Sequence, residues 1–569
     1  MSINKRKIKK RLLIAGATLV IAIGLLAIYF KYVIPLSPPQ WNDLHALKTE
    51  RVKAGDNFYV LGNNWLKKNK QGLWEMYVEG NAFDRGVVNG KLSQDLLINQ
   101  ENTFVDQINT LIPSKFYLGF LNNFVALFNR NIDKYVSPEY LLEIYGVSQS
   151  ASDRYEKYGS KYQRILNYHA AHDIGHALQN LHMVGCTSFS TWGKKSSDGN
   201  LLVGRNFDFY FGDDFAKDKI VCFCHPDKGY PFMMITWGGM IGAVSGMNEK
   251  GLTVTINAAK SEIPLGARTP ISIVTREILQ YAGNISEAYA IASKRRTFVS
   301  ESIMIGSAAD NKTVIIEKTP SQTVLYSTTN DYIISTNHFQ SKTLGKSKPN
   351  VEFMNQGSTV YRYQRVEELL KRYPQINYLN AAEILRNQKG LGDRNIGMGN
   401  EKAINQLIAH HSIIFEPSKL LVWVSGNPYQ LGEYVCYDLK KVFSKFRGLK
   451  HNIDISETGL TIPADTFLAS KGYQDYQFYR KYYQKIKEFK GFGQEILQNP
   501  GIINQFISSN PEYYAVYAVL GDYYSKTKAY KQSIKYYNLA LSKEIPNRNE
   551  RDEIIKLKNK CLSRCRKQM

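Results

Sequence analysis

The sequence predicts an α+β fold in which layered sheets are covered by helices, with a membrane-spanning helix before this body and an all-α region after it. Three observations lead to this prediction. Between Cys186 and about Val424, short apolar runs alternate with turn signals such as Asp-Gly and Lys-Gly, which is typical of strands. Longer stretches with helical periodicity lie between those runs. After residue 465 the chain becomes rich in tyrosine and lysine and follows a helical pattern almost throughout.

The first expected element is the spanning helix. Residues 12–30 form an uncharged run that follows a strongly basic flank at residues 1–11. This pattern is typical of an uncleaved anchor, here assigned to residues 12–34, with its N-terminus in the cytoplasm. A cleaved signal peptide is the alternative, but no small-residue cleavage site follows the run. We therefore expect a single-pass membrane protein whose main part is periplasmic or extracellular.

Length and composition narrow the class of protein. With 569 residues the chain is too long for one ordinary domain, and its 43% hydrophobic content argues against disorder. Six cysteines in this length exclude a disulfide scaffold, and no pair of them has zinc-finger spacing. The net charge of +23 suits a solvated surface or anionic lipid headgroups, and an exported chain is not expected to bind nucleic acid.

Changes in composition and hydrophobic periodicity along the chain predict its domains. After the anchor we expect a linker at 35–69, an N-terminal segment at 70–185, a sheet-rich segment at 186–464 and a helical module at 465–569. One helix at 165–183 should lead into Gly185. Within the sheet-rich segment, strands are expected at 201–203, 252–256, 313–317 and 332–335, and helices at 270–281 and 360–372.

The helical module contains one recognisable repeat. Its residues fall at the spacings of a tetratricopeptide helical hairpin, with a possible degenerate partner at 473–489 and a capping helix at 549–564. One interpretation is a docking surface for a protein or peptide partner. The other is a helical cap on the main domain, because an independent array needs three or more repeats. The residues concerned are Tyr517, Leu520, Gly521, Tyr524, Ser533, Tyr537, Ala540 and Pro546.

The residues that carry chemistry begin at Cys186. From there the alternation of residues and a Ser-Asp-Gly turn predict a strand, a hairpin and a second strand. Such a hairpin brings Cys186 beside Arg205 and Asp208. A nearby cation lowers the pKa of a thiol and so favours the nucleophilic thiolate. No histidine near Cys186 in the sequence completes a thiol-protease pair, so the base must come from elsewhere.

A family resemblance follows from the order of several motifs. These are LWEMYVEGNAFDRGVVNGKL at 73–92, CTSF at 186–189, DGNLLVGRNFDF at 198–209, GMNEKGLTVTIN at 246–257, STNH at 335–338 and Tyr361-Arg362-Tyr363. Together they resemble the N-terminal-nucleophile amide hydrolases of the choloylglycine hydrolase and penicillin V acylase type. They also resemble the autoproteolytic acyl-coenzyme A:6-aminopenicillanic acid acyltransferases. The resemblance covers about residues 70–430 and includes neither the anchor nor the helical module.

The resemblance implies a four-layer αββα core and self-cleavage between Gly185 and Cys186. Cleavage would turn Cys186 into a chain terminus whose α-amine, with a reference pKa of about 7.7–8.0, supplies the missing base. The resemblance implies that Cys186 is the nucleophile and base, and that Arg205 and Asp208 hold and polarise it. It implies that Asn257 and Asn337 stabilise the oxyanion. Arg362 is implied as a further arginine, for which Arg365 could substitute.

We therefore expect a cysteine enzyme that hydrolyses or forms a non-peptidic, linear amide through a thioester. The expected substrate is a small N-acyl amphiphile, which the anchor would meet at a membrane. No cofactor or metal is expected, and acyl-coenzyme A stays open as a co-substrate. Two alternatives remain, an inert scaffold that recruits partners through its tetratricopeptide-like tail, and a metalloenzyme built on His172 and His176 of the HDIGH motif.

Overall fold

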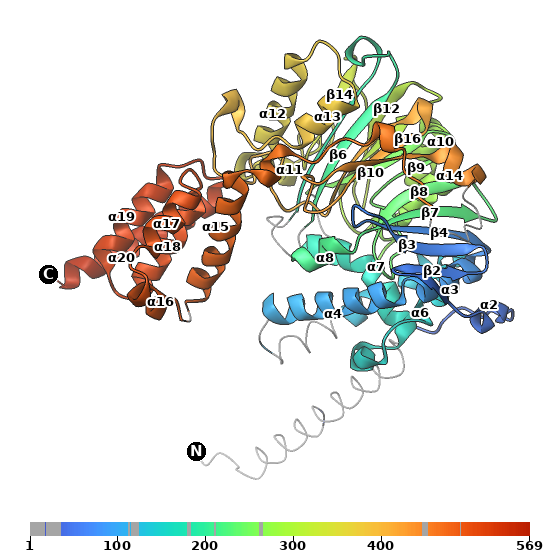
Figure 1. Cartoon of the computed structure of the whole chain (residues 1–569), viewed down its shortest axis with the longest axis horizontal. Coiled ribbons are helices and arrows are strands. Elements are labelled where there is room, and N and C mark those ends of the chain that lie inside the picture. The colour runs from blue at the N-terminus through green and yellow to red at the C-terminus, as the bar shows by residue number, and fades with distance from the viewer. Residues whose placement is uncertain are drawn as a thin grey trace, which may run out of the picture.

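Figure 1 shows the computed structural model of the chain, with a body of sheets and helices and a separate group of helices at the C-terminal end. The structure describes Thr18, Ser114 and residues 36–111, 125–178, 184–209, 212–260, 266–445, 453–489 and 491–568.

The structure corrects the predicted localisation. None of the helices it describes is long and apolar enough to cross a membrane. The long helices fail for a physical reason: α15 (Lys471–Glu488) and α20 (Arg548–Gln568), for example, carry many ionisable side chains, which a bilayer disfavours. The predicted spanning segment at 12–34 lies, apart from Thr18, outside the described residues. A single-pass membrane protein is therefore not supported.

Two sheets form the body. The larger has eleven strands in the order β1-β2-β3-β4-β7-β8-β9-β10-β11-β12-β13, and the smaller has six in the order β14-β5-β6-β15-β16-β17. Neighbouring strands are antiparallel except for β4 and β7, which are parallel. The bounds are β1 (Val52–Gly55), β2 (Phe58–Leu61), β3 (Asn64–Lys68), β4 (Trp74–Gly80), β5 (Val184–Thr191), β6 (Leu202–Phe209), β7 (Ile220–Pro226), β8 (Phe232–Thr236), β9 (Ser245–Asn248), β10 (Leu252–Ala258), β11 (Glu301–Ser307), β12 (Lys312–Lys318), β13 (Thr323–Tyr326), β14 (Tyr332–Ser335), β15 (His411–Glu416), β16 (Leu421–Ser425) and β17 (Tyr434–Asp438).

Helices cover the outer face of each sheet. The larger sheet packs against α9 and α10, and the smaller packs against α12 and α13. The inner faces meet in an apolar core that includes Val203, Val221, Met304 and Ile413. The body therefore has the layered α+β arrangement that the sequence predicts. Its helices are α2 (His45–Lys48), α3 (Ala82–Leu92), α4 (Gln94–Leu111), α6 (Pro138–Ser148), α7 (Lys161–Leu178), α8 (Asp213–Lys217), α9 (Ile271–Tyr281), α10 (Ile285–Lys294), α11 (Lys348–Gln356), α12 (Thr359–Arg372), α13 (Tyr378–Leu385) and α14 (Leu439–Lys445).

Most expected elements of the body are found, with bounds that match the expected ones or differ slightly from them. The strands expected at 252–256 and 332–335 are β10 and β14, and the helices expected at 270–281 and 360–372 are α9 and α12. The strand expected at 201–203 is the start of the longer β6, because pairing with β5 and β15 continues along it. The expected linker at 35–69 instead contains β1, β2 and β3, which extend the edge of the larger sheet. The other domain boundaries remain predictions.

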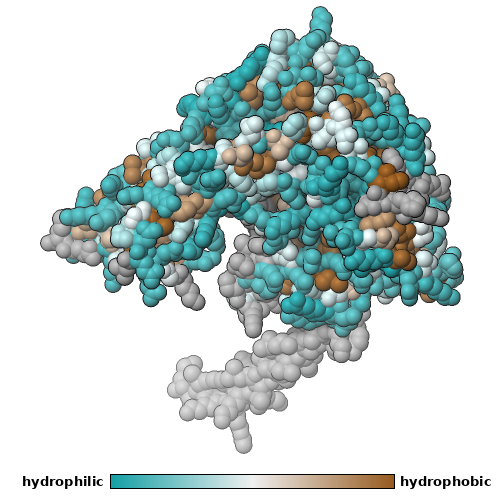
Figure 2. All heavy atoms as spheres, in the orientation of Figure 1, coloured by the Kyte–Doolittle hydropathy of each residue, from teal (hydrophilic) through white to brown (hydrophobic). Residues whose placement is uncertain are grey.

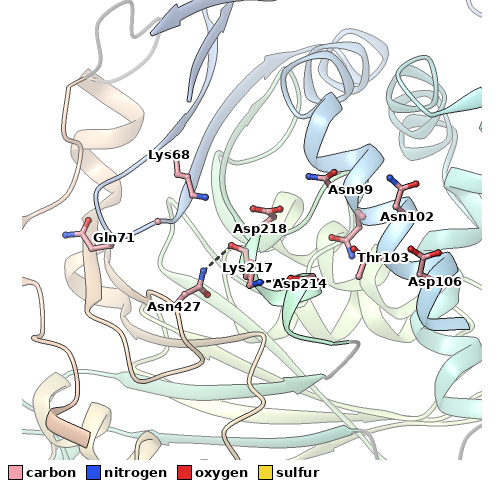
Figure 3. A pocket seen from close by; sticks show the side chains of 12 residues that line it. Lys68, Gln71, Asn99, Asn102, Thr103, Asp106, Asp214, Lys217, Asp218 and Asn427 are labelled. Atoms are coloured by element: carbon pink, nitrogen blue, oxygen red, sulfur yellow. Dashed lines mark hydrogen bonds and ion pairs between the residues drawn. The ribbon is translucent and has the colours of Figure 1, made fainter. Parts of the chain in front are cut away.

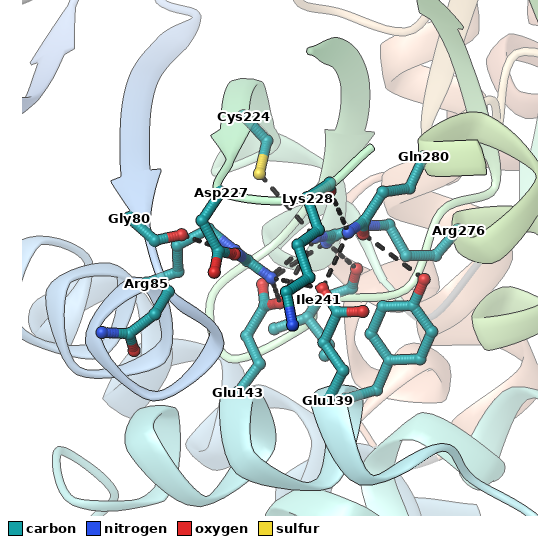
Figure 4. Close-up of polar contacts among 12 residues, drawn as sticks. Gly80, Arg85, Glu139, Glu143, Cys224, Asp227, Lys228, Ile241, Arg276 and Gln280 are labelled. Atoms are coloured by element: carbon teal, nitrogen blue, oxygen red, sulfur yellow. Dashed lines mark hydrogen bonds and ion pairs between the residues drawn. The ribbon is translucent and has the colours of Figure 1, made fainter. Parts of the chain in front are cut away.

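A buried ionic network joins the parts of the chain that precede and follow residue 185 (Figure 4). Glu143 of α6 contacts Arg85 of α3 at 2.8 Å and Arg276 of α9 at 3.3 Å, and both arginines are fully buried. Burial alone would raise the pKa of Glu143, but Arg276 and Arg85 outweigh it and lower that pKa. Since a buried ion that loses its partner is costly, this network ties the two parts of the chain together.

The last hundred residues form the tail, a group of helices connected to the body. Residues 517–540 lie mainly in two packed helices, as the repeat pattern predicts. Gly521 allows their close approach, because a Cβ there would lie 2.5 Å from the Tyr537 ring. The tetratricopeptide-like assignment itself remains a prediction. The helices are α15, α16 (Phe492–Gln498), α17 (Ile502–Ser509), α18 (Tyr514–Lys526), α19 (Tyr530–Leu541) and α20.

The tail packs on the body through aromatic and polar contacts. Leu407 and Tyr429 of the body share an apolar cluster with the tail's buried tyrosines. Arg480 of α15 pairs with Asp213 at 2.8 Å. Over the face drawn in Figure 2 the described surface is mostly hydrophilic, with apolar side chains scattered over it. The contacts between the tail and the body are those expected if the tail is a helical cap on the main domain.

Candidate active site

The pairing of β5 with β6 brings the expected nucleophile close to the charged residues that follow it in sequence. Gly185 lies opposite Asp208, and Ser188 lies opposite Arg205. Both strands are in the interior of the smaller sheet, and every residue of β6 is buried. The hairpin predicted from the alternation and the turn residues is therefore present, and it gathers Cys186, Arg205 and Asp208 in one place.

Two side chains from outside β5 hold the backbone of Cys186. Its N–H donates to Asn337 Oδ1 over 3.0 Å, and its carbonyl oxygen accepts from Arg362 Nη1 over 2.5 Å. Arg362 Nη2 also donates to Asn337 Oδ1, at 2.7 Å. The residue that follows the expected cleavage point is thus fixed on both its amide and its carbonyl side.

The thiol of Cys186 is buried next to a positive charge. Arg205 Nη2 lies 3.7 Å from Sγ and donates to it. Burial raises the pKa of the thiol, and Arg205 opposes that shift. Arg205 is itself held by neutral groups, the carbonyl oxygens of Val244 and Ile256 and the hydroxyl of Ser245. None of these hydrogen-bond partners carries a charge, so the Arg205 guanidinium can stabilise a thiolate, although Asp208 and Glu301 also act on it electrostatically.

Asp208 is a buried carboxyl beside the expected cleavage point. Burial raises its pKa to about 8, although Arg362 and Arg205 act in the opposite direction. Its Oδ2 accepts a long hydrogen bond of 3.4 Å from Gln406 Nε2, and its Oδ1 has no partner among the described residues. The carboxyl is therefore mainly protonated at neutral pH and offers the site a proton.

The two asparagines expected to stabilise an oxyanion lie next to the nucleophile. Asn257 at the end of β10 accepts from Ser188 Oγ at 3.0 Å and donates to the Ser335 carbonyl at 2.9 Å. Asn337 donates to a backbone carbonyl at 3.0 Å and uses its oxygen to hold the Cys186 amide. Each carboxamide has two N–H groups, so each keeps a second donor beyond the bond described.

Only one of the two candidate arginines of α12 reaches this site. Arg362 contacts Cys186 and Asn337, as described above. Arg365 is equally buried, but it pairs with Glu368 at 2.9 Å and Asp393 at 2.6 Å. The geometry therefore favours Arg362 for a role at Cys186.

A buried histidine pair behind Arg205 was not identified from the sequence. Ser245, which accepts from Arg205 at 2.5 Å, is 2.8 Å from His411 Nε2, and the Nδ1 atoms of His411 and His410 are 2.9 Å apart. Burial lowers the pKa of both histidines well below the usual value. Both histidines are fully buried, because β15 is an interior strand of the smaller sheet.

The alternative metal site stays untested, because the side chains of His172 and His176 lie outside the part of the chain that the structure describes. Within that part, no group of three or more histidine, cysteine, aspartate or glutamate residues is arranged to hold a metal ion.

Three cavities differ in their lining. One touches Phe209, which ends β6, and is mainly apolar, with Leu97, Phe104, Phe215 and Trp237 in its wall. A second, called the polar cavity because most of its lining side chains are polar, touches Gly185 and Arg362. The third, drawn in Figure 3, is lined by polar side chains of α4 and α8 and of neighbouring loops, and none of the expected site residues lines it. The first two are the candidates for binding a substrate.

Comparison with known proteins shows which family part of the chain is similar to. Residues 194–425 match the family model described as acyl-coenzyme A:6-aminopenicillanic acid acyl-transferase. The match confirms, over this part of the chain, the family resemblance that the motifs predict. It begins after Cys186 and ends before the tail, so neither lies within it.

Individual relatives are distant. An uncharacterized protein of Archaeoglobus fulgidus is 24% identical over 237 residues, which cover 38% of this chain and 38% of that protein. The alignment thus spans well under half of that relative. A Caenorhabditis elegans ortholog of N-acylethanolamine-hydrolyzing acid amidase is 18% identical, with 41% of this chain and 93% of that chain covered and a TM-score of 0.30. A conjugated bile acid hydrolase from Clostridium perfringens is 16% identical, with 45% of this chain and 93% of that chain covered and a TM-score of 0.31.

Proposed function

We propose that the protein is an N-terminal-nucleophile cysteine enzyme that activates itself by cutting between Gly185 and Cys186. It then hydrolyses or transfers the acyl group of a linear, non-peptidic amide. The observation that carries this proposal is the placement of Cys186, whose amide, carbonyl and thiol are contacted by Asn337, Arg362 and Arg205 respectively. The acyltransferase match over the residues that follow supports the same chemistry.

Self-cleavage starts when the thiol of Cys186 loses its proton and Sγ attacks the carbonyl carbon of Gly185. The bond from that carbon to the Cys186 nitrogen breaks as the nitrogen takes up a proton, and the acyl group remains on sulfur as a thioester. Water then hydrolyses the thioester, leaving a carboxylate at Gly185 and an α-amine at Cys186. Asp208, mainly protonated at neutral pH and opposite Gly185 in the sheet, would give the proton that the nitrogen takes up, and the proton released by the thiol would restore the acid.

Gly185 provides the unhindered carbonyl that this attack needs. A Cβ at this position would lie 2.4 Å from Gln406 Nε2 and 2.8 Å from Gln406 Oε1. Gln406 also donates to Asp208. A side chain at residue 185 would therefore displace the amide that contacts the proton-carrying group.

In the cleaved enzyme the α-amine of Cys186 is the general base. Its reference pKa of about 7.7–8.0 leaves a useful fraction neutral near pH 7. The amine takes the thiol proton, Sγ attacks the substrate's amide carbonyl, and the substrate's amine leaves with a proton. The remaining N–H groups of Asn257 and Asn337 would donate to the oxyanion. Water then completes hydrolysis, and an acceptor amine completes transfer.

The pair of cavities favours an amphiphilic substrate, in which an apolar acyl group is amide-linked to a polar head. Phe209, Phe215 and Trp237 offer the acyl group an apolar surface, and the cavity at Gly185 offers polar partners. N-acyl amino acids of increasing chain length test this part. If kcat/KM does not rise with acyl length, the acyl assignment is wrong while the amide chemistry stands.

Intact mass and N-terminal sequencing of the purified protein test the proposal as a whole. We expect two chains, the second beginning at Cys186. Cys186→Ala should remain one chain, whereas the control variants Cys222→Ala and Cys436→Ala should be cut normally, because those buried thiols lie outside the site. A protein that turns over an amide while remaining a single chain would contradict the mechanism.

A further inference from the structure

The polar cavity beside the expected cleavage point has walls from two distant parts of the chain. The body contributes residues around the end of β10, α11 and the start of α12, and the tail contributes the residues at the beginning of α20. Helix α20 also contacts α11 of the body. The lining includes Gly185, Lys260, Arg362 and Gln406 from the body, and Pro546, Asn547 and Asn549 from the tail.

The tail is attached to the body next to this cavity. The buried side chain of Asn400 donates to the Glu544 carbonyl over 2.9 Å, two residues before Pro546. Lys402 pairs with the carboxylate of the same Glu544 at 2.5 Å. These contacts join the tail to the segment that also carries Gln406, so they hold the tail's wall in place relative to Gly185.

The lining is positively charged at neutral pH. Lys260 and Arg362 each contribute one charge. Glu401 is the acidic residue of this lining, and burial and the neighbouring Glu550 raise its pKa to about 8, so it is mainly an uncharged hydrogen-bond donor. Its Oε2 is buried and has no partner among the described residues. Cations together with amide and carboxyl donors are the groups that bind a carboxylate.

We propose that the C-terminal helices complete the substrate pocket, and that their wall at 546–549 selects substrates whose polar head carries a carboxylate. This inference rests on the proposed function and deepens it. It assigns the tail to substrate recognition within the same chain, because the tail lines a cavity that reaches the residue next to the nucleophile.

Asn547→Asp is a sharp test, because it adds a negative charge to the wall while keeping the local fold. Asn547 Oδ1 accepts from the Glu550 amide over 2.9 Å at the start of α20, and aspartate caps a helix as well as asparagine does. The two substrates are N-lauroylglycine and N-lauroylethanolamine, which share an acyl chain and differ in the carboxylate. We expect KM for the glycine conjugate to rise about tenfold with kcat little changed, and KM for the ethanolamide to stay the same.

Two further variants make the test specific. Lys260→Gln should also raise KM for N-lauroylglycine selectively, because it removes a cation from the same cavity. Gln532→Glu adds the same charge at an exposed position of α19, outside this cavity, and should change neither KM. Self-cleavage of every variant is followed by intact mass.

The outcomes separate the two levels of the proposal. A parent protein that is neither cut nor active on either amide overturns the proposed function. A protein that is cut and active, but in which Asn547→Asp changes both KM values equally or not at all, overturns only the role of the tail. A cut protein that turns over neither amide, or the ethanolamide alone, overturns the assignment of a carboxylate head.

Discussion

Replacing Asp208 by asparagine tests whether this carboxyl is uncharged in the folded protein. Burial raises its pKa from 3.8 to about 8. Unfolding exposes the group to water and returns the pKa to its ordinary value. The folded state therefore holds the proton more tightly than the unfolded state. The resulting stability is complete below the unfolded pKa and is lost as pH rises towards the folded pKa.

The size of the effect follows from the pH range between the unfolded and the folded pKa of Asp208. Each pH unit inside it removes about 1.4 kcal/mol from the free energy of unfolding. Between pH 5 and pH 8, Asp208 should lower that free energy by about 4 kcal/mol, to order of magnitude. Asparagine has the same shape and does not ionise. The stability of Asp208→Asn relative to the parent should therefore increase by this amount over the same range.

Urea denaturation at pH 5 and pH 8 measures this difference, with both proteins in a Cys186→Ala background so that each stays one chain. Glu401, whose pKa is also raised to about 8, is present in both and cancels in the comparison. A relative stability that is the same at pH 5 and pH 8 would show that Asp208 is ionised in the folded state. The carboxyl could then not act as the proton donor of self-cleavage.

Four other predictions concern the site and the assembly of the cleaved enzyme. Asn337→Ala should lower turnover about a hundredfold in a protein that stays folded, because an oxyanion donor acts in the transition state; full activity in steady-state assays would remove it from the oxyanion site. Gly185→Ala should slow self-cleavage in a mass-spectrometric time course, because its Cβ would meet Gln406; adding Gln406→Ala should restore part of the rate, and no slowing would contradict the steric argument. After cleavage the two chains should elute together in gel filtration and separate in denaturant, because β4 and β7 pair across them; separate elution without denaturant would contradict this. His411→Phe should shift alkylation of the Cys186 thiol to higher pH, because it removes the partner of the Ser245 hydroxyl, which in turn accepts a hydrogen bond from Arg205. If the pH dependence of alkylation does not change, the histidine pair is purely structural.

Local patterns were enough to place the nucleophile hairpin. Alternating residues and the Ser-Asp-Gly turn predict β5 and β6, and their pairing brings Cys186 to Arg205. This part was predictable because strand register across a short hairpin depends on residues that are close in sequence. The same reasoning could not choose between Arg362 and Arg365, since a helix in the sequence does not reveal which of its faces packs on the sheet.

Other features had no local signal. The strands at the start of the larger sheet were expected to be a linker, because they are only four or five residues long and the first of them, β1, is an exposed edge strand. The burial of His410 and His411 could not be predicted locally, since it comes from the strands on either side of β15. The apolar run at 12–30 predicted a membrane protein from hydropathy alone, and no helix among the described residues supports it.

By itself, the sequence determined the family resemblance, the hairpin that carries Cys186 and the layered fold, because turn residues, periodicity and motif order act over short distances along the chain. Only the tertiary structure decided that burial raises the pKa of Asp208, that Gln406 touches Gly185, and that Asn547 lines the same cavity. These features depend on desolvation and on contacts between residues hundreds of positions apart. Both arise when the sheets and the tail pack together, and neither is visible in a local pattern.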